Sequence, residues 1–125
     1  MAQIQPLLGP IGGFVYTATV SNATAVNNPL ADTKVTLYQL EIDNTANSAV
    51  TFLKIYNAAS PAHASNAPFQ IWKVEGSTKQ HIIMPAGTEI GYFSYIVTTT
   101  QVNTGTPSAT ANPVDIALLY GSAPV

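Results

Sequence analysis

The chain has 125 residues, of which 46% are hydrophobic and 8% are charged, and its formal net charge is -2 at pH 7. The length predicts a single domain with a hydrophobic core, and the composition excludes disorder caused by high charge. The absence of Cys excludes disulfides and thiolate metal sites, and the absence of Arg excludes a guanidinium clamp for phosphate.

The positive side chains are few and scattered: they are Lys34, Lys54, Lys73 and Lys79. Because binding to a nucleic-acid backbone needs clustered cations, we expect no nucleic-acid partner. No stretch approaches the roughly 20 apolar residues that cross a membrane, so we expect no membrane partner. The first residues carry neither the basic segment nor the apolar run of a signal peptide, which predicts synthesis and folding in a cytoplasm.

Residues 1–13 are predicted to form an extended N-terminal arm, because two Pro and three Gly in this segment prevent regular structure. Its apolar side chains, Ile4, Leu7, Leu8 and Ile11, would be exposed on a free tail. They therefore either fold back on the domain or dock on a neighbouring subunit or partner.

The remaining chain alternates short apolar and polar runs between Pro, Gly and Asn, which predicts strands. The predicted strands are 14–20, 34–43, 50–57, 69–74, 79–84, 89–99 and 114–120. In the second, Tyr38, Leu40 and Ile42 share one face. A tight turn leads into the third, which we expect to pair with the second as a hairpin. Pro85 to Thr88 fits a type II turn.

Regularly spaced short strands without helical periodicity indicate an all-β sandwich or barrel. The Cys and Trp spacing of an immunoglobulin domain is missing. We therefore predict an antiparallel, jelly-roll-like β-sandwich that occupies residues 14–125 as a single domain.

The segment from Val35 to Gly121 resembles small bacteriophage virion proteins. The motifs are an Asn-Thr-Ala turn before a strand containing Lys-Ile-Tyr-Asn, then Pro-Ala-Gly, then an aromatic strand that ends in Thr-Thr. These motifs fall on Asn44, Thr45, Ala46, Lys54, Ile55, Tyr56, Asn57, Pro85, Ala86, Gly87, Phe93, Thr98 and Thr99. The sequence departs from the family at Ser65 to Pro68 and at Trp72.

The resemblance implies a capsid decoration (cement) protein, or else a head-fibre or tail component. Its motif residues are of the kinds found in turns and cores, so they indicate the fold more strongly than the function. Membership of such a family would place the protein in the virion, most simply as a homotrimer whose partner is the major capsid protein.

Side chains that could carry chemistry are few. Glu41 and Asp43 point to one side of a strand, but Ca²⁺ prefers about six to eight oxygen ligands, so we interpret them as a solvated face. His63 and His81 are too few for a zinc site. The sequence contains no nucleophile, phosphate or metalloprotease motif. We therefore expect no metal, no cofactor and no enzymatic activity.

Lys54 stands in an otherwise apolar strand, and two interpretations are open: its ammonium reaches water at the edge of a sheet, or it pairs with a carboxylate of another subunit. The aromatic residues Phe69, Trp72, Tyr92, Phe93 and Tyr95 also have several interpretations. They would pack in the core, form a subunit interface or stack against a sugar. Because Tyr92 and Phe93 are adjacent on a strand, they should face opposite sides.

We therefore expect a non-enzymatic virion protein, with a fibre or tail module that binds a host surface glycan as the alternative. The candidate contact residues for the capsid or a second subunit are Ile4, Leu7, Leu8, Ile11, Lys54, Trp72, Tyr92 and Tyr95. With so few charges, such contacts should depend only weakly on salt.

Overall fold

The computed structural model describes residues 14–20, 26–30, 34–62, 65–101, 104 and 106–122, and these residues form seven strands and no helix. The strands are β1 (Phe14–Val20), β2 (Val35–Asp43), β3 (Thr51–Tyr56), β4 (Gln70–Val74), β5 (Lys79–Ile90), β6 (Ser94–Thr98) and β7 (Val114–Ser122). The all-β prediction is confirmed. The predicted arm, residues 1–13, lies outside the described residues.

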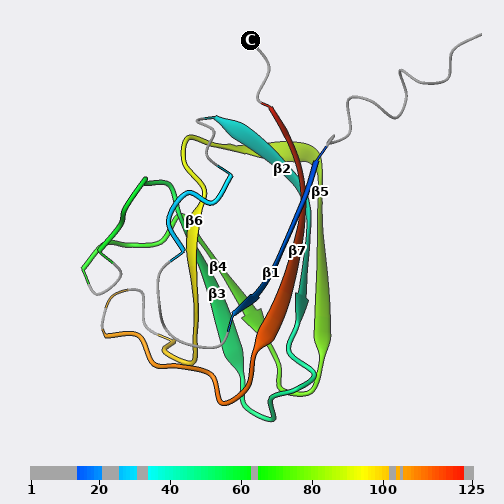
Figure 1. Cartoon of the computed structure of the whole chain (residues 1–125), viewed down its shortest axis with the longest axis vertical. Helices are drawn as coiled ribbons and strands as arrows, with labels where there is room; N and C mark the ends of the chain where they lie inside the picture. Colours follow the sequence, from blue (N-terminus) through cyan, green and yellow to red (C-terminus); the bar gives the residue numbers. More distant parts are fainter. Residues whose placement is uncertain are drawn as a thin grey trace, which may run out of the picture.

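The strands form two antiparallel sheets, one with the order β1-β7-β2-β5 and the other with the order β4-β3-β6. Figure 1 shows the four-stranded sheet on the right and the three-stranded sheet on the left. One cluster of buried side chains draws on both sheets, for example Leu40 and Ile116 from the first and Leu53 and Val97 from the second. The two sheets therefore face each other across a shared core.

Strand periodicity explains which residues enter this core. In β7, Val114, Ile116 and Leu118 are buried, while the side chains between them are not. Successive side chains of a strand point to opposite faces, so every second residue meets the facing sheet. Each such aliphatic side chain contributes about 1.5–3 kcal/mol when it is fully buried.

The predicted hairpin between the second and third strands is wrong. β2 pairs with β5 and β7, whereas β3 pairs with β4 and β6, so the chain crosses from one sheet to the other after Asp43. β3 is buried on both faces, unlike β2. A strand with apolar side chains on both faces is stable only where both faces are covered. β3 is the middle strand of its sheet, between β4 and β6.

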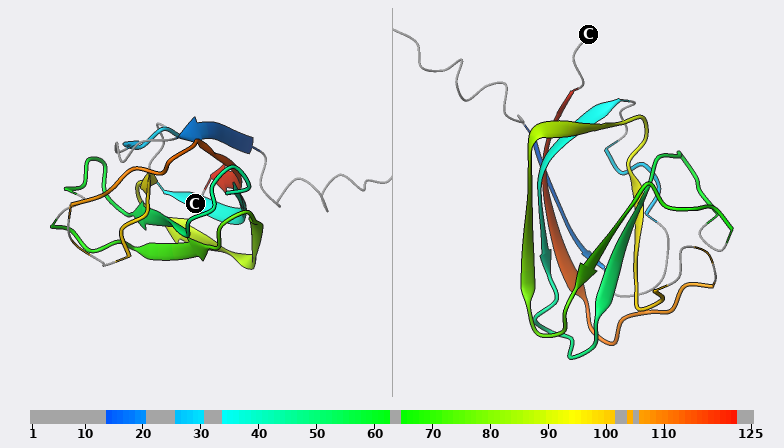
Figure 2. Two further views of the ribbon diagram at one scale, coloured as in Figure 1. Left: turned by 90° about the horizontal axis from the view of Figure 1, so that it is seen from below. Right: turned by 180° about the vertical axis from the view of Figure 1, so that it is seen from behind.

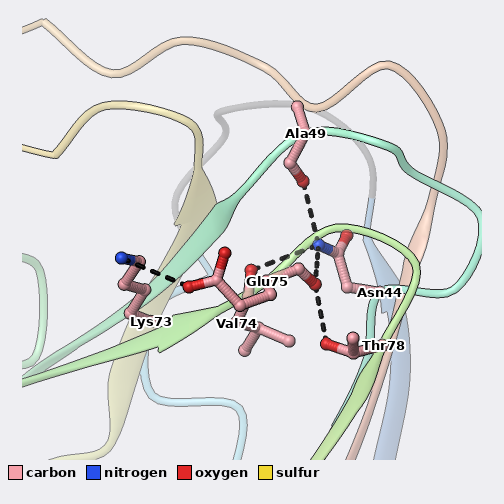
Figure 3. A network of polar contacts seen from close by, with 6 residues as sticks. All are labelled: Asn44, Ala49, Lys73, Val74, Glu75 and Thr78. Carbon is pink, nitrogen blue, oxygen red and sulfur yellow. Dashed lines mark hydrogen bonds and ion pairs between the residues drawn. The ribbon is translucent and has the colours of Figure 1, made fainter.

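The crossing is tied down at one corner of the molecule (Figure 3). The buried Asn44 amide donates to the carbonyl oxygens of Ala49, Val74 and Glu75 at 3.1, 3.4 and 3.2 Å. Its own side-chain oxygen accepts from Asn47 Nδ2 at 2.9 Å and from Thr51 Oγ1 at 3.1 Å. This one side chain therefore joins the connection before β3 to the turn after β4.

The predicted turn at Pro85 to Thr88 is also wrong, because β5 continues through it. The register of β5 against β2 changes between Leu37, opposite Thr88, and Gln39, opposite Ile83. Gly87 adopts φ 79°, where a side chain is strained, so the local turn chemistry makes a bulge within a strand.

The bulge also affects β2, because Tyr38 does not join Leu40 and Ile42 in the core. Tyr38 is only half-buried and approaches Gly87 together with Thr36. The predicted long strand 89–99 is divided as well: β5 ends at Ile90, and β6 begins at Ser94 in the other sheet.

The outer faces of the two sheets differ in their exposure. In β3, Phe52, Lys54 and Tyr56 alternate with the core residues, yet all three are buried. Two connections are bonded to the neighbouring strand β6 on this side: Ser94 Oγ donates to Ala58 O, and Thr98 Oγ1 to Ser108 O. Figure 1 shows both connections on the left, beyond β6. The outer face of the four-stranded sheet carries no such cover among the described residues, and it is the open face of the protein.

Candidate functional site

The open face consists of the side chains of the four-stranded sheet that point away from the core. The strand register aligns them in three rows. The rows are Val15, Leu119, Gln39 and Ile83; then Thr17, Ala117, Glu41 and His81; then Thr19, Asp115, Asp43 and Lys79.

The first row gives the open face an apolar end. Val15 is 68% exposed and Ile83 is 59% exposed, and the half-buried Leu119 lies between their strands. A shallow hollow of about 250 Å³ lies beside this row. Val15 and Ile83 stand on the two edge strands of the sheet, with Leu119 and Gln39 between them, so the row is mostly apolar and exposed at both ends.

The last row gives the open face an acidic end. Asp43 and Asp115 lie opposite each other on adjacent strands, beside a hollow of about 520 Å³. Thr19 Oγ1 donates to Asp115 Oδ1 at 2.7 Å. Hydrogen bonds from the Thr45 hydroxyl and backbone N–H lower the pKa of Asp43 below its ordinary value, although partial desolvation opposes them. Each carboxylate of this end therefore accepts at least one hydrogen bond from a threonine.

The acidic end does not make a metal site. Within the described ranges, no group of three or more His, Asp or Glu side chains is arranged to hold an ion. A further carboxylate, Glu75, pairs with Lys73 at 3.2 Å on the surface (Figure 3). The solvated strand face expected for Glu41 and Asp43 fits their half-exposed positions.

A separate hollow of about 420 Å³ lies at the connection after β3, away from the open face. Phe69, which is 44% exposed, lines it together with Asn57 and Asn66. Asn57 Oδ1 accepts from the backbone N–H groups of Gly91 and Tyr92 at 2.9 and 3.0 Å, which holds this wall in place. An exposed ring beside amide side chains is the combination that sugar-binding sites use.

The predicted aromatic contact residues separate into surface and core. Tyr92 is 38% exposed and its neighbour Phe93 is buried, but both lie in the connection between β5 and β6 and not on a strand as predicted. Trp72 is half-buried and donates from Nε1 to Gln70 Oε1 at 3.2 Å. Tyr95, in contrast, is 0% exposed. Its assignment to a surface is corrected: it packs in the core against Phe93 and Tyr16.

Lys54 is placed differently from its predicted position. β3 is the middle strand of its sheet, so Lys54 is not at a sheet edge, and the side chain is only 3% exposed. Burial lowers the pKa of its ammonium, because removal from water penalises the charged form. A residue buried by the chain's own connections does not offer its charge to another subunit's surface.

The remaining predicted contact residues, Ile4, Leu7, Leu8 and Ile11, lie outside the described residues. Sequence reasoning did not select Val15 or Ile83, although the signal existed. Val15 alternates with Tyr16 in β1, and Ile83 follows Ile82 in β5, so in each pair only one side chain can face the core. In a strand with one covered face, one of two adjacent apolar residues is therefore exposed.

The buried Tyr95, hydrogen-bonded to the half-buried Tyr16, predicts loss of stability at alkaline pH. Burial, and then the 2.8 Å hydrogen bond between the Tyr95 and Tyr16 hydroxyls, raise the pKa of Tyr95 above its ordinary value of 10.0. The folded chain therefore keeps Tyr95 neutral where the unfolded chain ionises it. This contribution to stability is complete below pH 10 and falls by about 1.4 kcal/mol for each pH unit above it.

The measurement is urea unfolding of the wild type and of Tyr95→Phe between pH of about 9 and about 11. Other groups titrate in both proteins, so the difference between the two isolates Tyr95. The stability of the variant should fall less steeply. Equal slopes would show that the Tyr95 hydroxyl is accessible to water in the folded protein.

Comparisons of the chain with protein-family models, with curated proteins and with solved structures find no match. No helix long and apolar enough to cross a membrane occurs in the part of the chain that the structure describes.

Proposed function

We propose that this protein is a structural virion protein, specifically a capsid decoration protein that binds the major capsid protein and stabilises the shell. The observation that carries the proposal is the open face of the four-stranded sheet, with exposed Val15 and Ile83 at one end. It is broad and shallow, which suits a protein surface better than a small substrate. The motifs shared with phage virion proteins support the same assignment.

The strand order supports a jelly roll as the finer description of the fold. Val26 forms an isolated bridge with Tyr95 of β6, which extends the smaller sheet by one short position. If the Val26 bridge is counted as a strand, the chain has eight strands in sequence order and Val26 is the second. The larger sheet then has the strand order 1-8-3-6, and the smaller sheet has the order 2-7-4-5. This is the order of a jelly roll, an architecture found in viral capsid and lectin domains.

Binding through the open face would stabilise the shell by burying apolar area that the free protein exposes. Such area contributes roughly 25 cal/mol per Å² before the costs of association. Val15, Leu119 and Ile83 would supply it, and the acidic row would select a neutral or basic surface on the capsid protein. Because many copies would bind one shell, a modest binding free energy per copy would add up to a large stabilisation of the shell.

The alternative is a fibre or tail component that binds a host surface glycan, and the hollow beside Phe69 favours it. The exposed ring offers a stacking surface, and Asn66 offers amide groups for sugar hydroxyls. The two functions use different surfaces of the protein, so single substitutions separate them.

The test compares Ile83→Ser with Phe69→Ser, because both remove an exposed apolar side chain and neither should unfold the protein. Co-sedimentation with capsid shells assembled without this protein measures shell binding. Decoration predicts that Ile83→Ser weakens it about tenfold and that Phe69→Ser leaves it unchanged. Glycan binding that only Phe69→Ser removes, with no binding to shells, would support the fibre function and overturn decoration.

A further inference from the structure

The two sheets have four edge strands, and the described residues protect three of them. β5 carries Lys79, His81, Pro85 and a bulge at Gly87. β4 has only five residues and carries Lys73. β6 is also short, and Val26 pairs with Tyr95 across its free side, with hydrogen bonds of 2.9 Å in both directions. Short length, charge, Pro and cover are the usual means of preventing strands from pairing with other molecules.

β1 has none of these protections. It is the edge of the four-stranded sheet, it pairs with β7 alone among the described strands, and its seven residues include no charge, no Pro and no Gly. Its side chains are exposed or only half-buried. Figure 2 shows β1 in dark blue at the outside of the molecule in the view from below. Its free backbone donors and acceptors fit one class of partner, an extended strand.

We propose that the β1 edge pairs antiparallel with β1 of a second copy of this chain, around a two-fold axis at Thr17. In this register Phe14 faces Val20 of the other copy, Tyr16 faces Ala18, and Thr17 faces its own counterpart. Each large side chain then meets a smaller one, and β-branched residues meet on the outward face, where Val15 faces Thr19.

The charges of the open face also fit this register. In each copy, Asp115 lies beside Thr19 in the acidic row. Thr19 would face Val15 of the second copy, whose neighbour is Leu119 of that copy. The acidic row of one copy would therefore continue into the apolar row of the other and not into a second carboxylate. No like charges meet across the two-fold axis. The two open faces would form one continuous surface of eight strands, and the inference holds whatever that surface binds.

The pairing predicts a two-fold dimer, because a strand edge that pairs with its own copy closes after two subunits. The homotrimer implied by the resemblance would need a different surface. Light scattering after size exclusion should therefore give twice the chain mass of 13.1 kDa for the wild type. A monomer or a trimer of the full chain would overturn the proposal.

Thr17→Lys places two ammonium groups opposite each other at the axis and should weaken the dimer about tenfold or more. Gln80→Lys adds the same charge on the exposed part of the β5 edge and should leave the dimer intact. Thr17→Glu should also give monomers, and mixing it with Thr17→Lys should restore a dimer of the two variants. If Thr17→Lys keeps the wild-type mass, or if the mixture stays monomeric, β1 pairing is excluded.

Discussion

Asn44→Ala should lower the free energy of unfolding by about 4 kcal/mol, the largest effect among the variants proposed for this protein. The substitution deletes both ends of a buried amide. Thr51 Oγ1 loses its acceptor, and the carbonyl groups of Ala49, Val74 and Glu75 lose a donor. Each buried polar group left without a partner costs about 1–3 kcal/mol. Several are created here, and water has little access to the fully buried site.

Asn27→Ala is the matched control for this prediction. It makes the same chemical change at an exposed side chain whose amide makes one long hydrogen bond, 3.4 Å to Ser60 Oγ. Its free energy of unfolding should stay within about 0.5 kcal/mol of the wild type. Urea unfolding measures both variants. Losses of similar size in the two would mean that the Asn44 network does not hold the corner together.

Gly76→Ala should be the next most harmful substitution, with a loss of about 3 kcal/mol. A Cβ added at Gly76 would lie 2.0 Å from Ser48 O, a backbone atom that cannot rotate away. To make room, the connection before β3 must move away from the turn after β4. That movement would break the 2.7 Å hydrogen bond from Ser77 N to Asn47 O.

Ser77→Gly, in the same turn, separates this steric effect from general sensitivity of the turn. Ser77 has φ 59°, where glycine is less strained than serine, while glycine also makes the unfolded chain more flexible. The two effects oppose each other, so we expect a change within about 1 kcal/mol. Thermal unfolding of both variants tests the prediction, and an unchanged melting temperature for Gly76→Ala would refute the close approach at Ser48.

The sequence predicted strand positions well where one face is buried. In β1 the Thr residues alternate with Tyr16, Ala18 and Val20, and this alternation depends only on neighbours along the chain. The prediction from the sequence failed at Pro85 to Thr88, where the local residue preferences favour a turn. There the pairing of β5 with β2 is a contact between distant residues, and it carries the strand through the Gly87 bulge.

Local sequence patterns also could not predict to which of the two sheets β3 belongs. Nothing between Asp43 and Thr51 distinguishes a hairpin from a crossing, because the difference lies in the buried Asn44 network and in the cover over β3. For the candidate site, the aromatic residues around β6 suggested a surface, but Tyr95 packs against its near neighbour Phe93 and against Tyr16 of the distant strand β1. The open face instead depends on isolated aliphatic residues such as Ile83.

The most direct test of the proposed function is the temperature at which capsid shells lose their integrity, measured with and without this protein. The wild type should raise that temperature, and Ile83→Ser, at equal concentration, should raise it clearly less, because the open face then buries less apolar area. No change with the wild type, or equal protection by both proteins, would contradict a decoration protein that stabilises its shell through the open face.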